Sequence, residues 1–302
     1  MTERLRVGTR GSRLAWTQTE SVIAELSRVA RGLRFEAVPV VTSGDRDRSP
    51  RSSPDFTDAI DRALLRGDVD LAVHSAKDLP LRLDPKLDLA ACPPRADPRD
   101  CLVVAPTISA TRLPHGTRVG SSSLRRRAQL LRWRADLRVV EVRGNVDTRL
   151  RLAGNRSVDA VVLALAGITR LGRASEVSRI LPVTAFLPAP AQGALAVVVR
   201  ADDARLGSVV RGIDHAGSHA RVLAERSFAA TLGGDCEMPL GALATLRGRS
   251  LSLRGEVLTA DGRTSLRRRL AGSTERAEEV GRRLGEEMLD SGARDLLPPA
   301  RA

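Results

Sequence analysis

The chain has 302 residues and a formal net charge of +13, and only 2% of its residues are aromatic. Hydrophobic residues make up 42% of it and charged residues 28%, which is typical of a soluble globular protein and excludes a disordered tail, a collagen and a disulfide miniprotein. This length suggests two domains and allows three. The sequence contains no apolar run long enough to span a membrane and no N-terminal signal-peptide pattern, so we expect a cytoplasmic protein.

Arginine carries almost all of the positive charge, because lysine occurs only at Lys77 and Lys86. A basic chain raises the possibility of nucleic-acid binding. However, the aromatic side chains that stack on bases are nearly missing, and no run of five like charges occurs. An acidic small molecule is the competing explanation for the charge.

The first part of the chain alternates strands and helices. Apolar stretches predict strands at residues 5–7, 35–41 and 69–73, and helices at 14–30 and 55–66. Ser12 is the expected N-cap of the first helix. The strand at 69–73 leads into the loop His74–Pro80.

The same pattern occurs again further along the chain. The segment Arg118–Arg126 resembles Arg6–Ser12, residues 137–142 resemble 35–41, and residues 157–163 resemble 67–73. The repetition predicts twin α/β domains with mostly parallel strands. After His219 the pattern changes to a hairpin around Asp261-Gly262 and a helix near 274–290, which predicts a third domain of α+β type.

Arginines cluster between residues 118 and 151. Arg125 and Arg126 lie where a turn enters a helix, and helix N-termini favour anions, so we expect these two to bind a carboxylate or phosphate. Arg132, Arg134 and Arg138 are interpreted as a solvated helix face.

Two further turns offer polar groups. Arg10 and Ser12 occupy the place in the first repeat that Arg125 and Arg126 occupy in the second, and the two turns could grip a polycarboxylate between them. Lys77 and Asp78 follow a buried strand at its carboxyl end, where ligands of α/β sheets bind.

The cysteines and histidines differ in what they suggest. Cys236 lies in a glycine-rich turn closed by a proline, which exposes backbone, whereas Cys92 and Cys101 are interpreted as small core residues. His215 and His219 have no third ligand at suitable spacing, so we expect no metal site.

Five motifs together resemble the porphobilinogen deaminase (hydroxymethylbilane synthase) family, and the match runs from Arg6 to Leu297. They are His74-Ser75-Ala76-Lys77-Asp78 within Val73–Pro80, Asp97–Asp100, Gly120–Arg126, Arg143–Leu150 and Cys236–Gly241.

The resemblance implies an architecture. It implies two α/β domains like those of periplasmic binding proteins, comprising residues 1–95 with 190–212 and residues 99–187, and a small α+β domain at 216–302 that carries the cofactor cysteine.

The resemblance also implies a reaction. Four porphobilinogen units are condensed head to tail on a covalent dipyrromethane with loss of ammonia, and linear hydroxymethylbilane is released for tetrapyrrole and haem biosynthesis. The enzyme is expected to be a cytoplasmic monomer without nucleic-acid or membrane partners. The dipyrromethane would be joined by a thioether to Cys236.

The family's site residues map onto this sequence by motif. The catalytic carboxylate falls on Asp78. A carboxylate close to a pyrrole nitrogen would stabilise the positive charge of an electron-poor methylene-pyrrolenine cation as that charge develops. Cofactor contacts fall on Cys236, Lys77, Ser75, Ser123, Arg125, Arg126, Arg149 and Asp45. Substrate contacts fall on Arg10, Ser12, Gln18, Arg143, Asn145 and Arg170.

Four positions depart from the family pattern. Arg51–Phe56 stands in place of a lysine-containing flap, Val198 in place of a glutamate, Thr231 in place of an arginine, and Asp235 in place of a glycine. An acid beside Cys236 disfavours the thiolate. Two alternatives therefore stay open: a divergent paralogue that binds or modifies another acidic pyrrole, and a non-catalytic polycarboxylate-binding protein.

Overall fold

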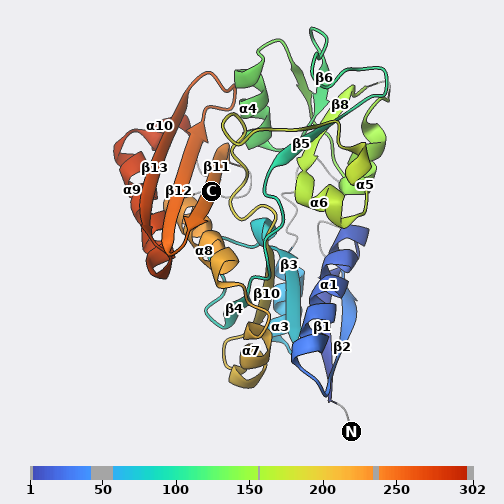
Figure 1. Ribbon diagram of the computed structural model, residues 1–302, viewed down its shortest axis with the longest axis vertical. Helices are drawn as coiled ribbons and strands as arrows, with labels where there is room; N and C mark the ends of the chain where they lie inside the picture. The colour runs from blue at the N-terminus through green and yellow to red at the C-terminus, as the bar shows by residue number, and fades with distance from the viewer. Residues whose placement is uncertain (1–2, 42–56, 156, 234–237, 298–302) are drawn as a thin grey trace. The chain divides into compact units, whose positions relative to one another are not determined.

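The computed structural model describes residues 3–41, 57–155, 157–233 and 238–297. The chain divides into two compact units. Unit 1 comprises residues 1–96 and 194–219, and unit 2 comprises residues 97–193 and 220–302. Each unit contains one five-stranded mixed sheet, and unit 2 also contains a three-stranded antiparallel sheet (Figure 1).

The sheet of unit 1 has the order β2-β1-β3-β10-β4. Strand β1 is parallel to β2 and β3, whereas β10 is antiparallel to β3 and β4. Apolar side chains of these strands and of the covering helices form its core, including Val7, Leu26 and Val197, all fully buried. The elements are β1 (Glu3–Arg10), α1 (Arg13–Val29), β2 (Leu33–Val40), α3 (Asp58–Leu65), β3 (Leu71–Ser75), the 3-10 turn η1 (Ala76–Asp78), β4 (Leu87–Ala91), β10 (Leu195–Arg200) and α7 (Ala204–Arg211).

The large sheet of unit 2 has the order β7-β6-β8-β5-β9. Strand β6 is parallel to β7 and β8, and β5 is antiparallel to β8 and β9. Apolar clusters lie on its strands, with Val161 and Leu102 fully buried in two of them. The elements are β5 (Asp100–Val104), β6 (Arg118–Gly120), α4 (Leu124–Trp133), β7 (Arg138–Val140), α5 (Val146–Leu152), β8 (Ala160–Ala164), α6 (Leu165–Arg170), η2 (Ala174–Glu176) and β9 (Arg179–Ile180).

The two large sheets therefore have one topology, as the sequence repeats predict. The same ion pair recurs in both. In unit 1 the backbone N–H of Arg6 donates to Asp70 Oδ2 at 2.7 Å, and its Nε does so at 3.1 Å. In unit 2 the backbone N–H and Nε of Arg118 donate to Asp159 Oδ2 at 2.7 and 3.0 Å. This repetition at side-chain level confirms the predicted twin fold. The prediction of mostly parallel strands is wrong, because two of the four described pairings in each large sheet are antiparallel.

The C-terminal part of unit 2 is a meander of three antiparallel strands with helices on one face. Gly255 and Gly272 allow this close packing, since a Cβ on either would lie 2.4 Å from an atom of Phe228 or Val280. The elements are α8 (Ala216–Thr231), β11 (Leu240–Arg247), β12 (Ser250–Leu258), β13 (Ser265–Ser273), η3 (Thr274–Arg276), α9 (Ala277–Asp290) and α10 (Ala293–Leu296). The predicted fold class, two α/β sheets with a small α+β part, is confirmed.

Several predicted boundaries move. The strand expected at 69–73 lies at Leu71–Ser75, because Asp70 is still in the preceding turn and pairs with Arg6. The helix expected at 274–290 begins with a 3-10 turn and becomes α-helical at Ala277. Ser12 is the predicted N-cap of α1, and its Oγ accepts the backbone N–H of Ala15 at 3.3 Å.

Candidate functional site

In unit 1, candidate residues gather at the carboxyl edge of the parallel strands. Strand β1 ends at Arg10, Ser12 caps helix α1, and β3 leads directly into the turn that carries Lys77 and Asp78. Because β1 and β3 are parallel neighbours, their carboxyl ends lie at the same edge. Arg10, Ser12, Lys77 and Asp78 are all partly buried.

Gln18 and Ser75 are joined directly. The Gln18 Nε2 donates to Ser75 Oγ at 3.1 Å, and Ser75 Oγ lies 3.2 Å from Gln18 Oε1. Gln18 is 4% exposed, so this contact fixes α1 against the end of β3. At the next residue of α1, Thr19 Oγ1 lies 2.8 Å from Thr9 Oγ1 in the buried interior. These hydrogen bonds hold helix α1 in a fixed position against the carboxyl ends of β1 and β3.

His74 and Asp61 form a buried pair that the local sequence pattern does not predict. His74 Nε2 lies 3.4 Å from Asp61 Oδ1, and the two side chains are 2% and 13% exposed. The pair connects α3 to β3, immediately before Ser75. No signal in the local sequence marked Asp61, because α3 also contains the charged residues Asp58 and Arg62.

In unit 2, helix α4 begins at the carboxyl end of β6. Ser123 is its N-cap and accepts the backbone N–H of Arg126 at 3.4 Å. The first turn of α4 carries Arg125 and Arg126, which are 2% and 6% exposed. Both guanidinium groups contact Asp100, which is fully buried: Arg125 Nη1 lies 2.8 Å from Oδ2, and Arg126 Nη2 lies 2.7 Å from Oδ1.

Burial and charge act in opposite directions on Asp100. Burial would raise the pKa of its carboxyl, but the guanidinium groups of Arg125 and Arg126 hold that pKa well below its usual range. Gln192 Nε2 also donates to Asp100 Oδ1 at 2.9 Å. Two cations and one anion leave this buried trio with a net positive charge. The helix-entry arginines therefore have a structural carboxylate partner that the sequence analysis did not foresee, and their predicted role toward a cofactor stays a prediction.

The interpretation of Arg132, Arg134 and Arg138 as a solvated helix face is wrong. Helix α4 ends at Trp133, Arg134 is partly buried and paired with Asp136, and Arg138 begins strand β7. Arg132 Nη1 contacts the carboxylate of Glu256 on β12, and Glu256 is fully buried. Gln129, also fully buried, donates to Glu256 Oε2 at 3.0 Å. The signal for Glu256 was a single acid within an apolar strand, but only the packing of α4 on that strand reveals its partners.

The remaining predicted residues of unit 2 lie near the starts and ends of short helices. Asn145 caps α5, with its Oδ1 accepting the N–H of Thr148 at 2.9 Å, and Arg149 lies within α5. Arg143 is exposed and its Nε lies 2.9 Å from Glu141 Oε1. Arg170 ends α6 and donates to the carbonyl of Gly193 at 2.8 Å.

Arg170 gives a test of fit for an anionic group. Burial lowers the pKa of its guanidinium to about 10. A carbonyl oxygen carries only a partial charge, so a ligand carboxylate would compensate this cation better. The residues of unit 2 therefore fit a ligand that carries carboxylate groups.

Some predicted positions lie outside the described residues: Cys236, Asp45, Asp235 and the segment Arg51–Phe56. Two departures from the family pattern are visible. Val198 is fully buried in β10, opposite Ala72 of β3, so it is a core residue. Thr231 donates to the carbonyl of Ser227 at 2.9 Å at the end of α8.

Cys92 and Cys101 are both fully buried, which confirms their interpretation as core residues. Burial raises the pKa of the Cys101 thiol to about 12. Within the described ranges, no three His, Cys, Asp or Glu side chains are grouped so that they could hold a metal ion. None of the helices in those ranges is long and apolar enough to cross a membrane.

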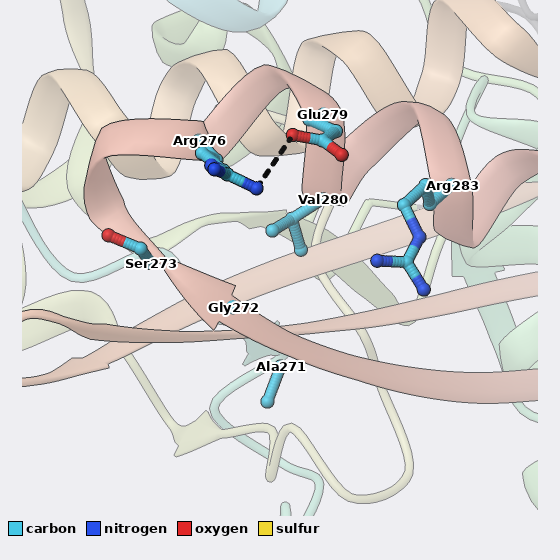
Figure 2. Close-up of a pocket in the computed structure, with 7 residues that line it drawn as sticks. All are labelled: Ala271, Gly272, Ser273, Arg276, Glu279, Val280 and Arg283. Carbon is cyan, nitrogen blue, oxygen red and sulfur yellow. Dashed lines mark ion pairs between the residues drawn. The ribbon is translucent and has the colours of Figure 1, made fainter.

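A cavity of about 240 Å³ lies away from these residues, between strand β13 and helix α9. Figure 2 shows Arg276 and Glu279 paired at its edge, with Val280 between the helix and the strand. Arg276 Nη1 lies 3.9 Å from Glu279 Oε2, and Arg276 is exposed whereas Glu279 is half-buried. None of the predicted site residues lines this cavity.

Comparison with known proteins covers nearly the whole chain. Residues 5–208 match the family description "Porphobilinogen deaminase, dipyromethane cofactor binding domain", and residues 219–290 match "Porphobilinogen deaminase, C-terminal domain". The porphobilinogen deaminase of Syntrophus aciditrophicus is 42% identical over 298 residues, with 97% of each chain covered. That of Nocardia farcinica is 45% identical over 305 residues, covering 97% of this chain and 88% of its own.

Among solved structures, the methionine-binding protein MetQ is similar with a TM-score of 0.45 and 16% identity, covering 74% of this chain and 93% of its own. The periplasmic VFT2 domain of Bordetella pertussis BvgS has a TM-score of 0.43 and 17% identity, covering 74% of this chain and 92% of its own. The full-length sequence matches decide the assignment: the chain belongs to the porphobilinogen deaminase family.

Proposed function

We propose that this transferase of the porphobilinogen deaminase family, which acts in tetrapyrrole biosynthesis, condenses four porphobilinogen units into hydroxymethylbilane and releases ammonia at each condensation. The observation that carries the proposal is the turn after β3, where Lys77 and Asp78 stand at the carboxyl edge of the unit 1 sheet in a chain matched by both family descriptions. That edge is where α/β sheets bind their ligands.

Asp78 is the proposed catalytic residue. Loss of ammonia from porphobilinogen breaks its C–N bond and leaves an electron-poor methylene-pyrrolenine cation. A carboxylate held in place near the pyrrole nitrogen stabilises this charge as it develops. The backbone around Asp78 suits this task, because the N–H of Ala76 donates to the carbonyl of Ala194 at 3.0 Å and fixes the start of its turn.

Dipyrromethane is the proposed cofactor, and when bound it supplies the covalent primer to which porphobilinogen units are added. The sulfur of Cys236 would hold it by a thioether bond. Side chains proposed to bind its carboxylates are Ser75, Lys77, Ser123, Arg125, Arg126 and Arg149. Asp45 is proposed to contact another group of the cofactor, because its own carboxylate would repel a second one. The net positive charge of Arg125, Arg126 and Asp100 together and the buried guanidinium of Arg170 support an acidic ligand.

A second set of residues is proposed to bind the acetate and propionate arms of porphobilinogen. In unit 1 the contact between Gln18 and Ser75 holds Gln18 in place. In unit 2 the buried guanidinium of Arg170 favours a carboxylate partner. The full set is Arg10, Ser12, Gln18, Arg143, Asn145 and Arg170.

The proposal is tested by the mass of the purified protein. We expect the intact protein to be heavier than its sequence by one dipyrromethane and to give colour with an acidified aldehyde reagent. Peptide mapping should place the added mass on Cys236, and Cys236→Ser should lack both the mass and the activity. Unmodified Cys236 in active protein would overturn the proposal.

The same preparation separates the alternatives. A loaded protein that consumes no porphobilinogen would favour a divergent paralogue acting on another acidic pyrrole. An unloaded protein that binds polycarboxylates would favour a non-catalytic binding protein. We further propose that the enzyme is a cytoplasmic monomer with no nucleic-acid partner. Light scattering after gel filtration would test the proposed monomeric state.

A further inference from the structure

Glu256 is a fully buried carboxylate on strand β12 whose partners come from two other elements. Gln129 Nε2 donates to its Oε2 at 3.0 Å, and Arg132 Nη1 contacts its Oε1. Arg267, the residue directly opposite on β13, donates through Nε to Oε1 at 3.0 Å. The carboxylate therefore joins helix α4 to the small antiparallel sheet.

Helix α4 contacts the same region at a second point. Arg125 Nη1 and Gln129 Nε2 donate to the carbonyl of Leu187 at 2.7 and 3.0 Å. The next carbonyl, that of Pro188, accepts the N–H of Ala242 in β11 at 2.9 Å. Helix α4 is thus connected to β11 through residues 187–188 and to β12 through Glu256.

Gly241 shows how closely these parts pack. It is the residue opposite Glu256 in the β11–β12 pair. A Cβ at this position would lie 2.9 Å from the carbonyl oxygen of Leu187, so no larger residue fits. The backbone of β11 therefore lies directly against the segment that α4 holds.

Both connected elements bear on the proposed function. Strand β11 begins four residues after Cys236 in the sequence, and the carbonyl of Pro239 accepts the N–H of Leu258 from β12 at 3.0 Å. Helix α4 carries Ser123 at its N-cap and Arg125 and Arg126 in its first turn.

We propose that Glu256 is a positioning residue, which holds the sheet that follows the cofactor cysteine in a fixed register with the helix that carries the cofactor-binding arginines. This inference rests on the proposed function. Removing the charge would leave Arg132 and Arg267 without their buried carboxylate and loosen α4 on β12, and small misplacements of binding groups are costly in rate.

The test compares Glu256→Gln with wild type and with two further variants. Arg132→Lys keeps the positive charge but loses the planar set of guanidinium donors that contacts Glu256. This variant tests the same contact if Glu256→Gln fails to fold. Asp159→Asn is the control, because it removes a carboxylate paired with an arginine of the same unit, Arg118, and neither residue of this pair belongs to α4 or β12. Each protein is measured for dipyrromethane content by intact mass, for kcat and KM, and for amide hydrogen exchange.

For Glu256→Gln we expect at least a threefold fall in dipyrromethane content and a fall in kcat per loaded enzyme of about tenfold. The KM for porphobilinogen should stay within a factor of about two, because the proposed substrate contacts lie outside α4. Arg132→Lys should also lower the dipyrromethane content and kcat. Asp159→Asn should leave both the dipyrromethane content and kcat unchanged.

Hydrogen exchange separates this inference from the proposed function. Amides of α4 and β11 should exchange faster together in Glu256→Gln and not in Asp159→Asn, even if the wild type carries no dipyrromethane. Wild-type cofactor content and kcat in Glu256→Gln, or unchanged exchange in α4 and β11, would overturn the positioning role. An unloaded wild type would instead overturn the proposed function.

Discussion

The two large sheets share a topology, yet they carry different residues at equivalent places. The register aligns Val7 of β1 with Leu71 of β3, and Val119 of β6 with Ala160 of β8. Lys77 and Asp78 after β3 therefore correspond to Ala166 and Gly167 after β8, both buried. Unit 1 places charged groups where unit 2 places small apolar ones.

The helices that follow the first strands show the reverse. Arg125 and Arg126 are the second and third residues after the N-cap Ser123, whereas the same positions after Ser12 are Leu14 and Ala15. The expectation that Arg10 and Ser12 occupy the place of Arg125 and Arg126 is therefore wrong, since the N-cap Ser12 corresponds to the N-cap Ser123. Unit 2 thus buries two arginines against Asp100 where unit 1 has apolar residues. The shared topology therefore does not determine which reactive or ligand-binding side chains each unit carries. The residues of the turns and of the first helical turns determine them.

The largest expected effect follows from breaking the buried trio of unit 2. Arg126→Leu leaves Asp100 with one fewer cation in the interior, and removing one partner of a buried ion pair typically costs about 3–5 kcal/mol. Chemical denaturation should show this loss. The exposed Arg127 is the matched control, and Arg127→Leu should keep near-wild-type stability. An Arg126→Leu protein as stable as wild type would contradict the structural contribution of the pair with Asp100 and would leave Arg126 with its proposed cofactor contact alone.

Thiol reactivity compares buried cysteines of the two units. Cys92 belongs to unit 1 and Cys101 to unit 2, and both are fully buried. With the pKa of Cys101 raised to about 12 by burial, that thiol stays protonated at pH 8. We expect a thiol reagent to modify neither residue in the native protein and to modify both after denaturation, as mapped by peptide mass. Rapid native labelling of Cys101 would contradict its burial.

The pH dependence of stability tests the charge state of Asp100. Its folded pKa lies below the unfolded value of about 3.9, so its contribution is fully present above that value and is lost as the pH falls further. Asp100→Asn should therefore be less stable than wild type at pH 7. The difference should narrow below about pH 4. A difference that does not change with pH would show that Asp100 is not ionised in the folded protein.

The smallest effect is expected where the two units are most alike. Asp70→Asn and Asp159→Asn each remove a carboxylate that an arginine holds through its backbone N–H and its Nε. Both pairs are partly solvated, so each change should lower the melting temperature by less than about 4 °C, and by similar amounts. Differential scanning calorimetry of both variants checks this. A large loss of melting temperature in only one of the two variants would show that the two ion pairs do not contribute equally to stability.

The sequence predicts the scaffold well because the repeated strands are apolar and continuous. The cap at Ser12 and the burial of Cys92 and Cys101 also follow from local patterns. The partners of Arg125, Arg126 and Arg132 do not, because Asp100 and Glu256 are distant in sequence and reach these arginines only through tertiary packing.

The candidate site is predicted in part. The turn with Lys77 and Asp78 and the contact edge around Gln18 and Ser75 fall where the motifs indicate. The pair of His74 and Asp61 was not foreseen, since no local pattern links a helix to a strand ten or more residues away. The assigned roles of all these residues stay predictions until variants are measured.

The most direct test of the account is the rate of ammonia release from porphobilinogen by wild type and Asp78→Asn of equal dipyrromethane content. The substitution keeps the shape of the side chain and removes its charge, so the account predicts a rate lower by about 10²–10³ with an unchanged melting temperature. Asp78→Glu should retain part of the activity. Near-wild-type ammonia release by folded Asp78→Asn protein would contradict the account.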